Sequence, residues 1–232
     1  MSALLRKALR AVVPKSSRES LRRRHRDFVF SRALDRFVKN PSAALDPRDR
    51  LLQDLIYGWG SDWSALDEYL TECLRHALVC EGPILECGSG LTTILVGAIA
   101  KKRNLIMWTL EHLPEWGKRV TKYTGKLGID SVNVSVKKLR DYSEFMWYDP
   151  PLDEMPDTFA LVICDGPPGG TPGARYGLAA VMRDKLRPGC VILLDDAAWE
   201  TQQKTAARWS VELSGTYTTL GSKKPYIRMV LQ

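Results

Sequence analysis

Several features that define other classes of protein are scarce in this sequence of 232 residues. It has three histidines and five cysteines, and no two cysteines have the C-x-x-C spacing of a zinc or redox motif. We therefore predict no zinc site and no disulfide framework, and we interpret the cysteines as reduced, mostly buried thiols. No apolar run approaches the roughly 18 residues that span a membrane. Residues 1–13 also lack the uninterrupted apolar core of a secretory signal, so we expect a cytoplasmic protein.

Acidic residues are scarce at the start of the chain and ordinary elsewhere. Residues 1–40 contain 12 Lys or Arg and 3 Asp or Glu, a formal charge of +9. Because the whole chain carries +7, the remaining 192 residues carry −2. A nearly neutral body argues against a nucleic-acid groove on it, and the basic charge belongs to an N-terminal arm.

We assign this basic helical arm to residues 1–49. Residues 4–13 place apolar side chains on one helical face and basic ones on the other, and Pro14 ends this helix. A second helix is expected over 17–38. Three interpretations stay open: packing on the body, contact of residues 1–13 with an anionic membrane surface, and a mitochondrial presequence. Nucleic-acid contact is disfavoured, because no aromatic stacking platform is interleaved with the charge.

From residue 50 onward, strand patterns alternate with helix patterns. We expect strands at 83–87, 105–111, 132–136, 159–165 and 190–196, and helices at 64–79, 91–102, 114–127, 174–186 and 200–213. Two last strands flank a turn too short for a crossover helix, so they must be antiparallel. The pattern predicts one α/β domain over 50–232, with a Rossmann-like doubly wound sheet that is mostly parallel and ends in an antiparallel hairpin.

Carboxylates follow the expected strands, where open α/β sheets bind their ligands. They are Glu86, Glu111, Asp141, Asp165 and the pair Asp195–Asp196. A turn of small residues, Gly-Ser-Gly, comes directly after the first of these strands. Its glycines allow a tight turn and a close approach of a ligand to the backbone. Thr93 stands where a dinucleotide fingerprint needs its third glycine, which disfavours NAD. A carboxylate at the entrance of this cradle would favour a ligand with a positive centre, such as S-adenosylmethionine.

The stretch ILECGSGLTT resembles the first motif of class I S-adenosylmethionine-dependent methyltransferases, E/D-x-G-x-G, and the resemblance extends over about residues 56–232. It implies that Glu111 binds the ribose hydroxyls and that Asp165, in LVICDGPPG, is the acidic residue of the fourth strand. Asp141, after the third strand, is a looser match to the residue that meets adenine. The predicted cofactor contacts are Glu86, Gly88, Gly90, Thr92, Glu111, His112, Asp141 and Asp165.

Asp165 together with Asp195 and Asp196 is similar to the Mg²⁺ site of catechol and macrolide-sugar O-methyltransferases. Such a site would hold two neighbouring hydroxyls and activate one of them. The alternative is a loop pair without a metal. The catechol enzymes have a lysine base where this chain has Pro168, so the sequence assigns no such base. With a bound metal to activate the hydroxyl, Asp165 or Asp196 is the expected proton acceptor. The expected methyl acceptor is a hydroxyl on a glycan, glycolipid or small polyol. Arg175 or Tyr176, after a glycine-rich loop, are candidate substrate contacts.

Three rival functions remain. Asp149-Pro150-Pro151 resembles the D-P-P-Y motif of N-methyltransferases, but the better strand at 159–165 follows it. An NAD-dependent oxidoreductase is disfavoured by Thr93 and by the lack of a Tyr-x-x-x-Lys motif. A non-catalytic binding or scaffold protein of the same fold is the third alternative.

Overall fold

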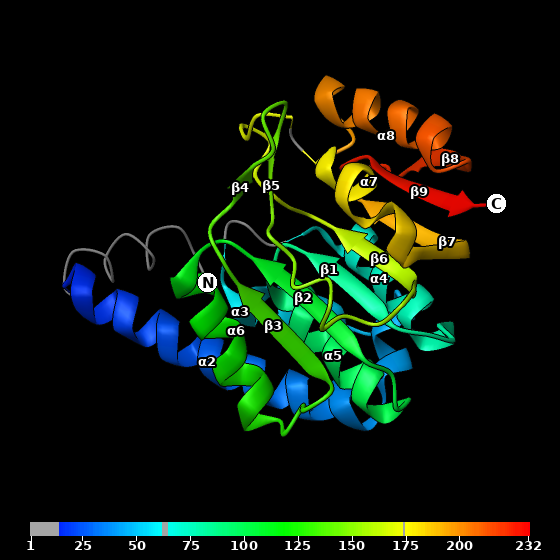
Figure 1. Ribbon diagram of the computed structural model, residues 1–232. Helices are drawn as coiled ribbons and strands as arrows, with labels where there is room; N and C mark the ends of the chain where they lie inside the picture. Colours follow the sequence, from blue (N-terminus) through cyan, green and yellow to red (C-terminus); the bar gives the residue numbers. More distant parts are fainter. Residues whose placement is uncertain (1–13, 62–64, 174) are drawn as a thin grey trace. The chain divides into compact units, whose positions relative to one another are not determined.

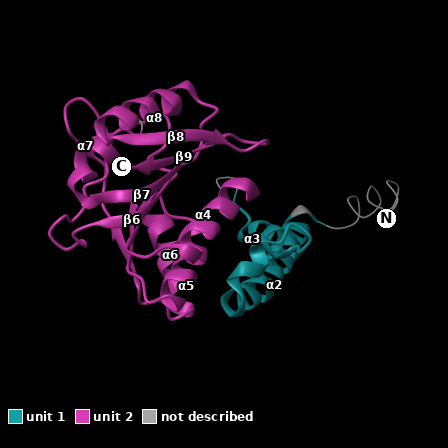
Figure 2. Cartoon of the chain, turned by 90° about the vertical axis from the view of Figure 1, so that its right-hand side faces the viewer, with its two compact units in different colours: residues 1–64 teal, residues 65–232 magenta. Residues whose placement is uncertain are grey.

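A computed structural model of the chain describes residues 14–61, 65–173 and 175–232. The chain forms two compact units, residues 1–64 and 65–232 (Figure 2), which we describe one at a time. Residues 1–13, to which the membrane and presequence interpretations refer, lie outside the described residues. The domain boundary predicted after residue 49 stays a prediction.

The first unit is helical. Its elements are α2 (Lys15–Lys39), the 3-10 helix η1 (Pro41–Leu45) and α3 (Leu51–Trp59). The ring of His25 on α2 lies within hydrogen-bond distance of the Tyr57 hydroxyl on α3, at 2.9 Å. Away from this contact, Leu21 and Phe28 expose 69% and 60% of their surface among the arginines of α2. The helix expected at 17–38 is confirmed, whereas α3 was not expected from the sequence.

None of the helices within the described ranges is both long enough and apolar enough to cross a membrane.

The second unit contains a seven-stranded sheet in the order β3-β2-β1-β6-β7-β9-β8 (Figure 1). The strands are β1 (Ile84–Cys87), β2 (Met107–Glu111), β3 (Val132–Val136), β6 (Phe159–Cys164), β7 (Leu186–Leu194), β8 (Gly215–Leu220) and β9 (Tyr226–Leu231). The pairs from β3 to β7 are parallel, and β9 is antiparallel to both of its neighbours. The predicted doubly wound sheet with a final antiparallel hairpin is therefore confirmed.

Helices cover both faces of this sheet (Figures 1 and 2). They are α4 (Asp67–Val79), α5 (Leu91–Lys102), α6 (Pro114–Lys126), α7 (Gly177–Met182) with the 3-10 turn η2 (Arg183–Lys185), and α8 (Glu200–Glu212). The helices α4, α5 and α6 lie on one face, and α7 and α8 lie on the other. Ten consecutive residues of α5 are buried, which explains why its sequence is apolar on all sides. Pro114 begins α6, where its missing N–H costs no helical hydrogen bond.

The segment between β3 and β6 crosses the α7 face of the sheet. It contains a two-stranded sheet of β4 (Arg140–Asp141) and β5 (Met146–Trp147), which we had expected to be a loop. Trp147 and Tyr148 are buried there in the hydrophobic core. The helix expected at 174–186 is shorter in the structure, because Leu186 already pairs with Phe159 of β6 and belongs to the sheet.

The packing of α7 on this aromatic segment leads to a stability prediction. A methyl group on Gly177 would overlap Cβ and Cγ of Trp147. We therefore expect Gly177→Ala to lower the free energy of unfolding by about 1–3 kcal/mol. The matched control is Gly125→Ala in α6, where no atom lies within 4 Å of the added methyl group, and it should gain about 0.5–1 kcal/mol. Urea unfolding of both variants measures the difference, and equal effects would contradict the close packing.

Candidate functional site

The carboxyl ends of β1 and β6 form the centre of the site. These neighbouring strands connect outward in opposite directions, β1 to β2 and β6 to β7, which makes this the switch point of the sheet. The backbone N–H of Asp165 donates to the carbonyl of Cys87 at 2.9 Å, so the two strand ends are joined. Gly88 follows with φ +95°, and a Cβ there would lie 3.1 Å from the nitrogen of Gly166. Only glycine satisfies both conditions without strain.

Glu111, at the end of β2, holds the glycine-rich turn. Its Oε2 accepts hydrogen bonds from the backbone N–H of Ser89 at 3.0 Å and from the Ser89 hydroxyl at 2.6 Å. Its Oε1 accepts from the N–H groups of His112 and Leu113 at 2.7 and 2.8 Å. Burial alone would raise the pKa of Glu111, but contacts with His112, Ser89 and Leu113 hold it below its usual value. Glu111 and the turn therefore form one unit with a fixed negative charge.

Glu86 lies beneath this turn, fully buried. From the sequence we expected its carboxylate at the entrance of the cradle, so that interpretation of its electrostatic role has to be corrected. Glu86 Oε2 accepts hydrogen bonds from the hydroxyls of Thr93 at 2.5 Å and Thr109 at 2.9 Å. Burial raises the pKa of Glu86 to about 7, against these hydrogen bonds. At neutral pH this side chain is therefore only partly charged.

Thr93 has a role that the sequence reasoning missed. Its hydroxyl accepts a hydrogen bond from the backbone N–H of Gly90 at 2.8 Å while it donates to Glu86. Thr93 thus couples the turn to the buried carboxyl group. The residue had been noted only as a departure from a dinucleotide motif, and its bond to the N–H of Gly90 resembles the contact that a Glu or Gln at this position makes in a capping box.

The other predicted cofactor contacts lie at different depths. Thr92 is buried, and Gly90 is half-buried with only the Trp116 ring nitrogen, at 3.9 Å, near the position of a Cβ. His112 Nδ1 lies 3.2 Å from Glu111 Oε1. Asp141 is exposed on β4, and its carboxylate accepts from the N–H of Ser143 at 2.8 Å. The space above Gly90 suits a ligand that lies against the backbone, and the individual contacts stay predictions.

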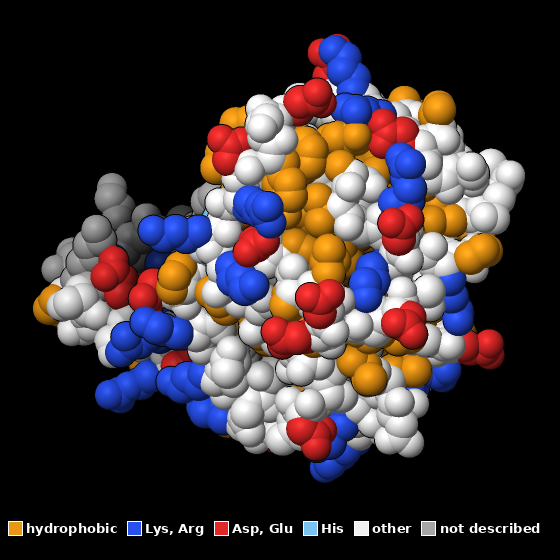
Figure 3. All heavy atoms as spheres, in the orientation of Figure 1, with side chains coloured by type: hydrophobic (Ala, Val, Ile, Leu, Met, Phe, Trp, Pro, Cys, Tyr) orange, Lys and Arg blue, Asp and Glu red, His pale blue; other side chains and the backbone are white. Residues whose placement is uncertain are grey.

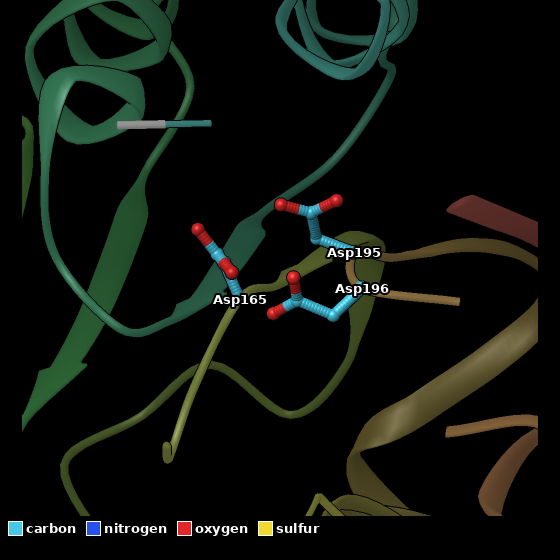
Figure 4. Close-up of side chains that lie close together, drawn as sticks. All are labelled: Asp165, Asp195 and Asp196. Carbon is cyan, nitrogen blue, oxygen red and sulfur yellow. The ribbon is translucent and has the colours of Figure 1, made fainter. Parts of the chain in front are cut away.

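The three predicted metal ligands come together at the ends of β6 and β7. One carboxylate oxygen each from Asp165, Asp195 and Asp196 lies within 4.8 Å of the others (Figure 4). Asp195 is fully buried, whereas about a quarter of the side-chain surface of Asp165 and of Asp196 is exposed. Asp196 adopts φ 62°, a left-handed conformation that is uncommon outside glycine. The backbone is therefore bent to turn this second carboxylate into the cluster.

Two cationic side chains also belong to the cluster. Arg175 Nη2 donates to Asp165 Oδ1 at 3.1 Å and to Asp196 Oδ2 at 2.7 Å. Lys224 Nζ lies 2.8 Å from Asp195 Oδ2 and 2.7 Å from Asp196 Oδ1. We had expected Arg175 as a substrate contact, but its side chain is 2% exposed and faces the carboxylates, so that expectation is wrong. Lys224, in the hairpin turn before β9, was not expected in the site at all.

These contacts set the protonation of the cluster. Burial raises the pKa of Asp165 to about 7, and Asp195 and Asp196 add to this rise while Arg175 opposes it. The pKa of Asp196 is lowered, because Arg175 and Lys224 outweigh the effect of its burial. The pKa of Arg175 is raised by Asp165 and Asp196, so it stays a cation.

The donor set of the cluster fits Mg²⁺ only in part. Three converging carboxylates are suitable hard ligands, but Mg²⁺ needs octahedral oxygen ligands at about 2.0–2.1 Å. Arg175 and Lys224 already engage both oxygens of Asp196 and one oxygen each of Asp165 and Asp195. A divalent ion would have to replace at least one of these cations. With both cations in place, the cluster does not fit Mg²⁺.

Asp149, the basis of the N-methyltransferase alternative, lies elsewhere. It follows β5 and precedes β6, so the position at the end of the fourth parallel strand belongs to Asp165. Its carboxylate pairs with Arg140 at 3.3 Å and Lys137 at 3.8 Å. The topology therefore agrees with the sequence interpretation that Asp149 precedes the fourth strand of the motif.

Apolar side chains reach the surface beside the site. On the face shown in Figure 3, hydrophobic side chains gather between the β4–β5 hairpin and α7, with charged side chains around them. Tyr142 and Phe145 stack with ring centroids 5.0 Å apart, and Tyr176 meets Phe145 edge-on at 5.2 Å. Phe145 is buried, whereas Tyr142 and Tyr176 are partly exposed and bring aromatic surface and hydroxyl groups to a face suited to a small organic molecule.

Comparison with known proteins finds structures of similar fold but no similar sequence. No protein-family model and no curated protein matches the sequence. Among solved structures, a precorrin-6y C5,15-methyltransferase from Geobacter metallireducens aligns with a TM-score of 0.55 at 14% identity, over 75% of this chain and 91% of its own. An O-methyltransferase from Bacillus cereus, in complex with S-adenosylhomocysteine (SAH), aligns with a TM-score of 0.51 at 16% identity, over 100% and 98%.

A third likeness is to the O-methyltransferase TomG from Streptomyces achromogenes, in complex with S-adenosylmethionine (SAM). It has a TM-score of 0.51 at 15% identity, over 86% of this chain and 89% of TomG. At these identities the likeness concerns the fold. This chain has the fold of the class I SAM-dependent methyltransferases.

Proposed function

We propose that this protein is an SAM-dependent methyltransferase that methylates a hydroxyl group on a glycan, glycolipid or small polyol. The observation that carries the proposal is the unit formed by Glu111 and the turn at Ser89, at the switch point of a methyltransferase fold. Two proteins of this fold have been solved with SAM or SAH bound, which supports the same cofactor here. The partly exposed carboxylates of Asp165 and Asp196 support an acceptor that must lose a proton.

SAM supplies a methyl group on a positively charged sulfur. In the proposed reaction the carbon–sulfur bond breaks as the acceptor oxygen bonds to that carbon, and SAH leaves. Glu111 would bind the ribose hydroxyls, and the turn from Gly88 to Gly90 would contact the methionine part through its backbone. Positioning supplies most of the rate enhancement in such a displacement.

The acceptor proton needs a base, and Asp165 has the better geometry for it. Among the described residues, its only hydrogen-bonded carboxylate oxygen is Oδ1, which leaves Oδ2 for an acceptor hydroxyl. Both oxygens of Asp196 are engaged by Arg175 and Lys224. We therefore assign proton transfer to Asp165 and a supporting electrostatic role to Asp196.

Calorimetric titration with SAM and SAH tests the cofactor. We expect micromolar binding by the wild type and a loss of about tenfold to hundredfold in Glu111→Ala, because hydrogen bonds to a charged group contribute about 1.5–3 kcal/mol. Glu115→Ala is the control, since Glu115 lies at the start of α6 with 88% of its side-chain surface exposed. It should bind as the wild type does.

The outcomes separate the alternatives. A folded wild-type protein that binds neither ligand would overturn the methyltransferase proposal. Binding of SAM without methyl transfer to any hydroxyl acceptor would favour the non-catalytic alternative. Transfer to amines in preference to hydroxyls, lost in Asp149→Ala, would favour the N-methyltransferase alternative.

A further inference from the structure

We propose that Arg175 and Lys224 take the place of a divalent metal in the acidic cluster, so that this site works without one. The proposal rests on the proposed function for the identity of the reaction. It changes the expected acceptor, because a metal-assisted site selects two neighbouring hydroxyls that can both bind the ion. A site with built-in cations has no such requirement, and a single hydroxyl is sufficient.

The position of Arg175 is the first support. Its guanidinium donates to the backbone carbonyls of Asp195 at 2.7 Å and Cys164 at 3.4 Å, as well as to Asp165 and Asp196. It therefore joins the end of β6 to the end of β7 from inside the protein. Arginine does not lose its proton in proteins, and its planar fork suits several oxygens at once. Displacement of this cation would therefore cost its hydrogen bonds to both strand ends.

Lys224 is the second support. It comes from the β8–β9 hairpin and reaches the opposite side of the cluster, where it bridges Asp195 Oδ2 and Asp196 Oδ1. Three carboxylates and two cations leave one formal negative charge. A divalent ion bound to these carboxylates would be repelled by Arg175 and Lys224, which contact the same carboxylates. This repulsion opposes metal binding.

The two cations differ in how easily they can be removed. The side chain of Lys224 is 30% exposed, whereas that of Arg175 is 2% exposed. Loss of Lys224 would free Asp195 Oδ2 and Asp196 Oδ1 without disturbing the contacts of Arg175. These two oxygens and Asp165 Oδ2 would then be available to a metal. Lys224 is therefore the side chain whose removal should convert the cluster into a metal site.

The experiment measures Mn²⁺ binding by electron paramagnetic resonance, with Mn²⁺ as the probe for a Mg²⁺ site. We expect no saturable binding by the wild-type protein up to about 1 mM Mn²⁺, and binding at least about tenfold tighter in Lys224→Ala. The matched control is Lys223→Ala, because Lys223 pairs with Asp67 at 2.7 Å. This variant should behave like the wild type. Circular dichroism checks that each variant is folded.

Saturable wild-type binding below about 1 mM, lost in Asp196→Asn, would overturn the proposal. So would a Lys224→Ala variant that is folded and binds no Mn²⁺. These readouts need no methyl transfer, so they are separate from the SAM and SAH titration that tests the function. Where transfer is measurable, EDTA should leave its rate unchanged, and acceptors with one hydroxyl should react as well as diols.

Discussion

Replacing Arg175 with methionine should lower the free energy of unfolding by about 3–5 kcal/mol, the usual effect of removing one partner from a buried ion pair. The variant would leave Asp165 without its cation and would reduce the charge compensation of Asp195 and Asp196. It would also remove the donors of two backbone carbonyls at the strand ends. Chemical unfolding at pH 7 measures the change.

A loss of about 5 kcal/mol can equal the whole stability of a domain, so Arg175→Met could fail to fold. Two further variants therefore keep the prediction testable. Arg175→Lys keeps the charge but loses the planar fork, so it should fold with a smaller loss. The control is Arg183→Met, because the Arg183 side chain is 56% exposed and lies 3.5 Å from Glu212. It should change stability by about 0.5 kcal/mol or less. A loss below about 1 kcal/mol in Arg175→Met would contradict the role given to this residue.

The buried carboxyl group of Glu86 should make stability fall as pH rises. Its pKa is about 7 in the folded protein against 4.5 as the ordinary value. Between these two values the folded chain keeps a proton that the unfolded chain has released. The contribution of Glu86 to the free energy of unfolding is therefore fully present below about pH 4.5, and it is lost as the pH rises through about 7. The gap between the two pKa values corresponds to about 3 kcal/mol.

Glu86→Gln isolates this effect, because the amide cannot ionise. Relative to the wild type, its free energy of unfolding should rise by about 3 kcal/mol between pH 4 and pH 8. Asp165 also has a raised pKa, but it contributes equally to both proteins and cancels in the difference. Unfolding curves at several pH values provide the measurement. The control is Glu115→Gln, which removes a carboxylate at an exposed position and should not produce the same trend. If the stability of Glu86→Gln and that of the wild type change in parallel with pH, the assignment to Glu86 is refuted.

The fold could be predicted because it depends on local patterns. Apolar strands, amphipathic helices and glycine turns each occupy a short stretch, and the alternation of strand and helix limits the sheet to a few topologies. The position of Asp165 at the end of β6 followed directly from this order. The end of α7 at Met182 was not predicted, because the limit of the helical stretch depends on the pairing of Leu186 with Phe159, which are far apart in the sequence.

The site was predicted less completely, for a physical reason. Which carboxylates meet follows from strand order, but which cations meet them depends on how distant side chains orient. Lys224 lies 29 residues beyond Asp195 in the sequence, in a turn whose composition marks only a surface hairpin. The depth of Glu86 was also hidden, because a residue at a strand end can face either the ligand or the core.

The position of β9 between β7 and β8 affects how the chain is assembled during synthesis. β8 leaves the ribosome before β9, yet its partner in the sheet is β9, and β9 also covers the edge of β7. The nascent chain therefore holds an open strand edge until residues 226–231 emerge, a state in which sheets associate with other chains. Lys224 lies two residues before that strand begins. Closure of the sheet edge and arrival of the second cation at the aspartates thus belong to the same late step.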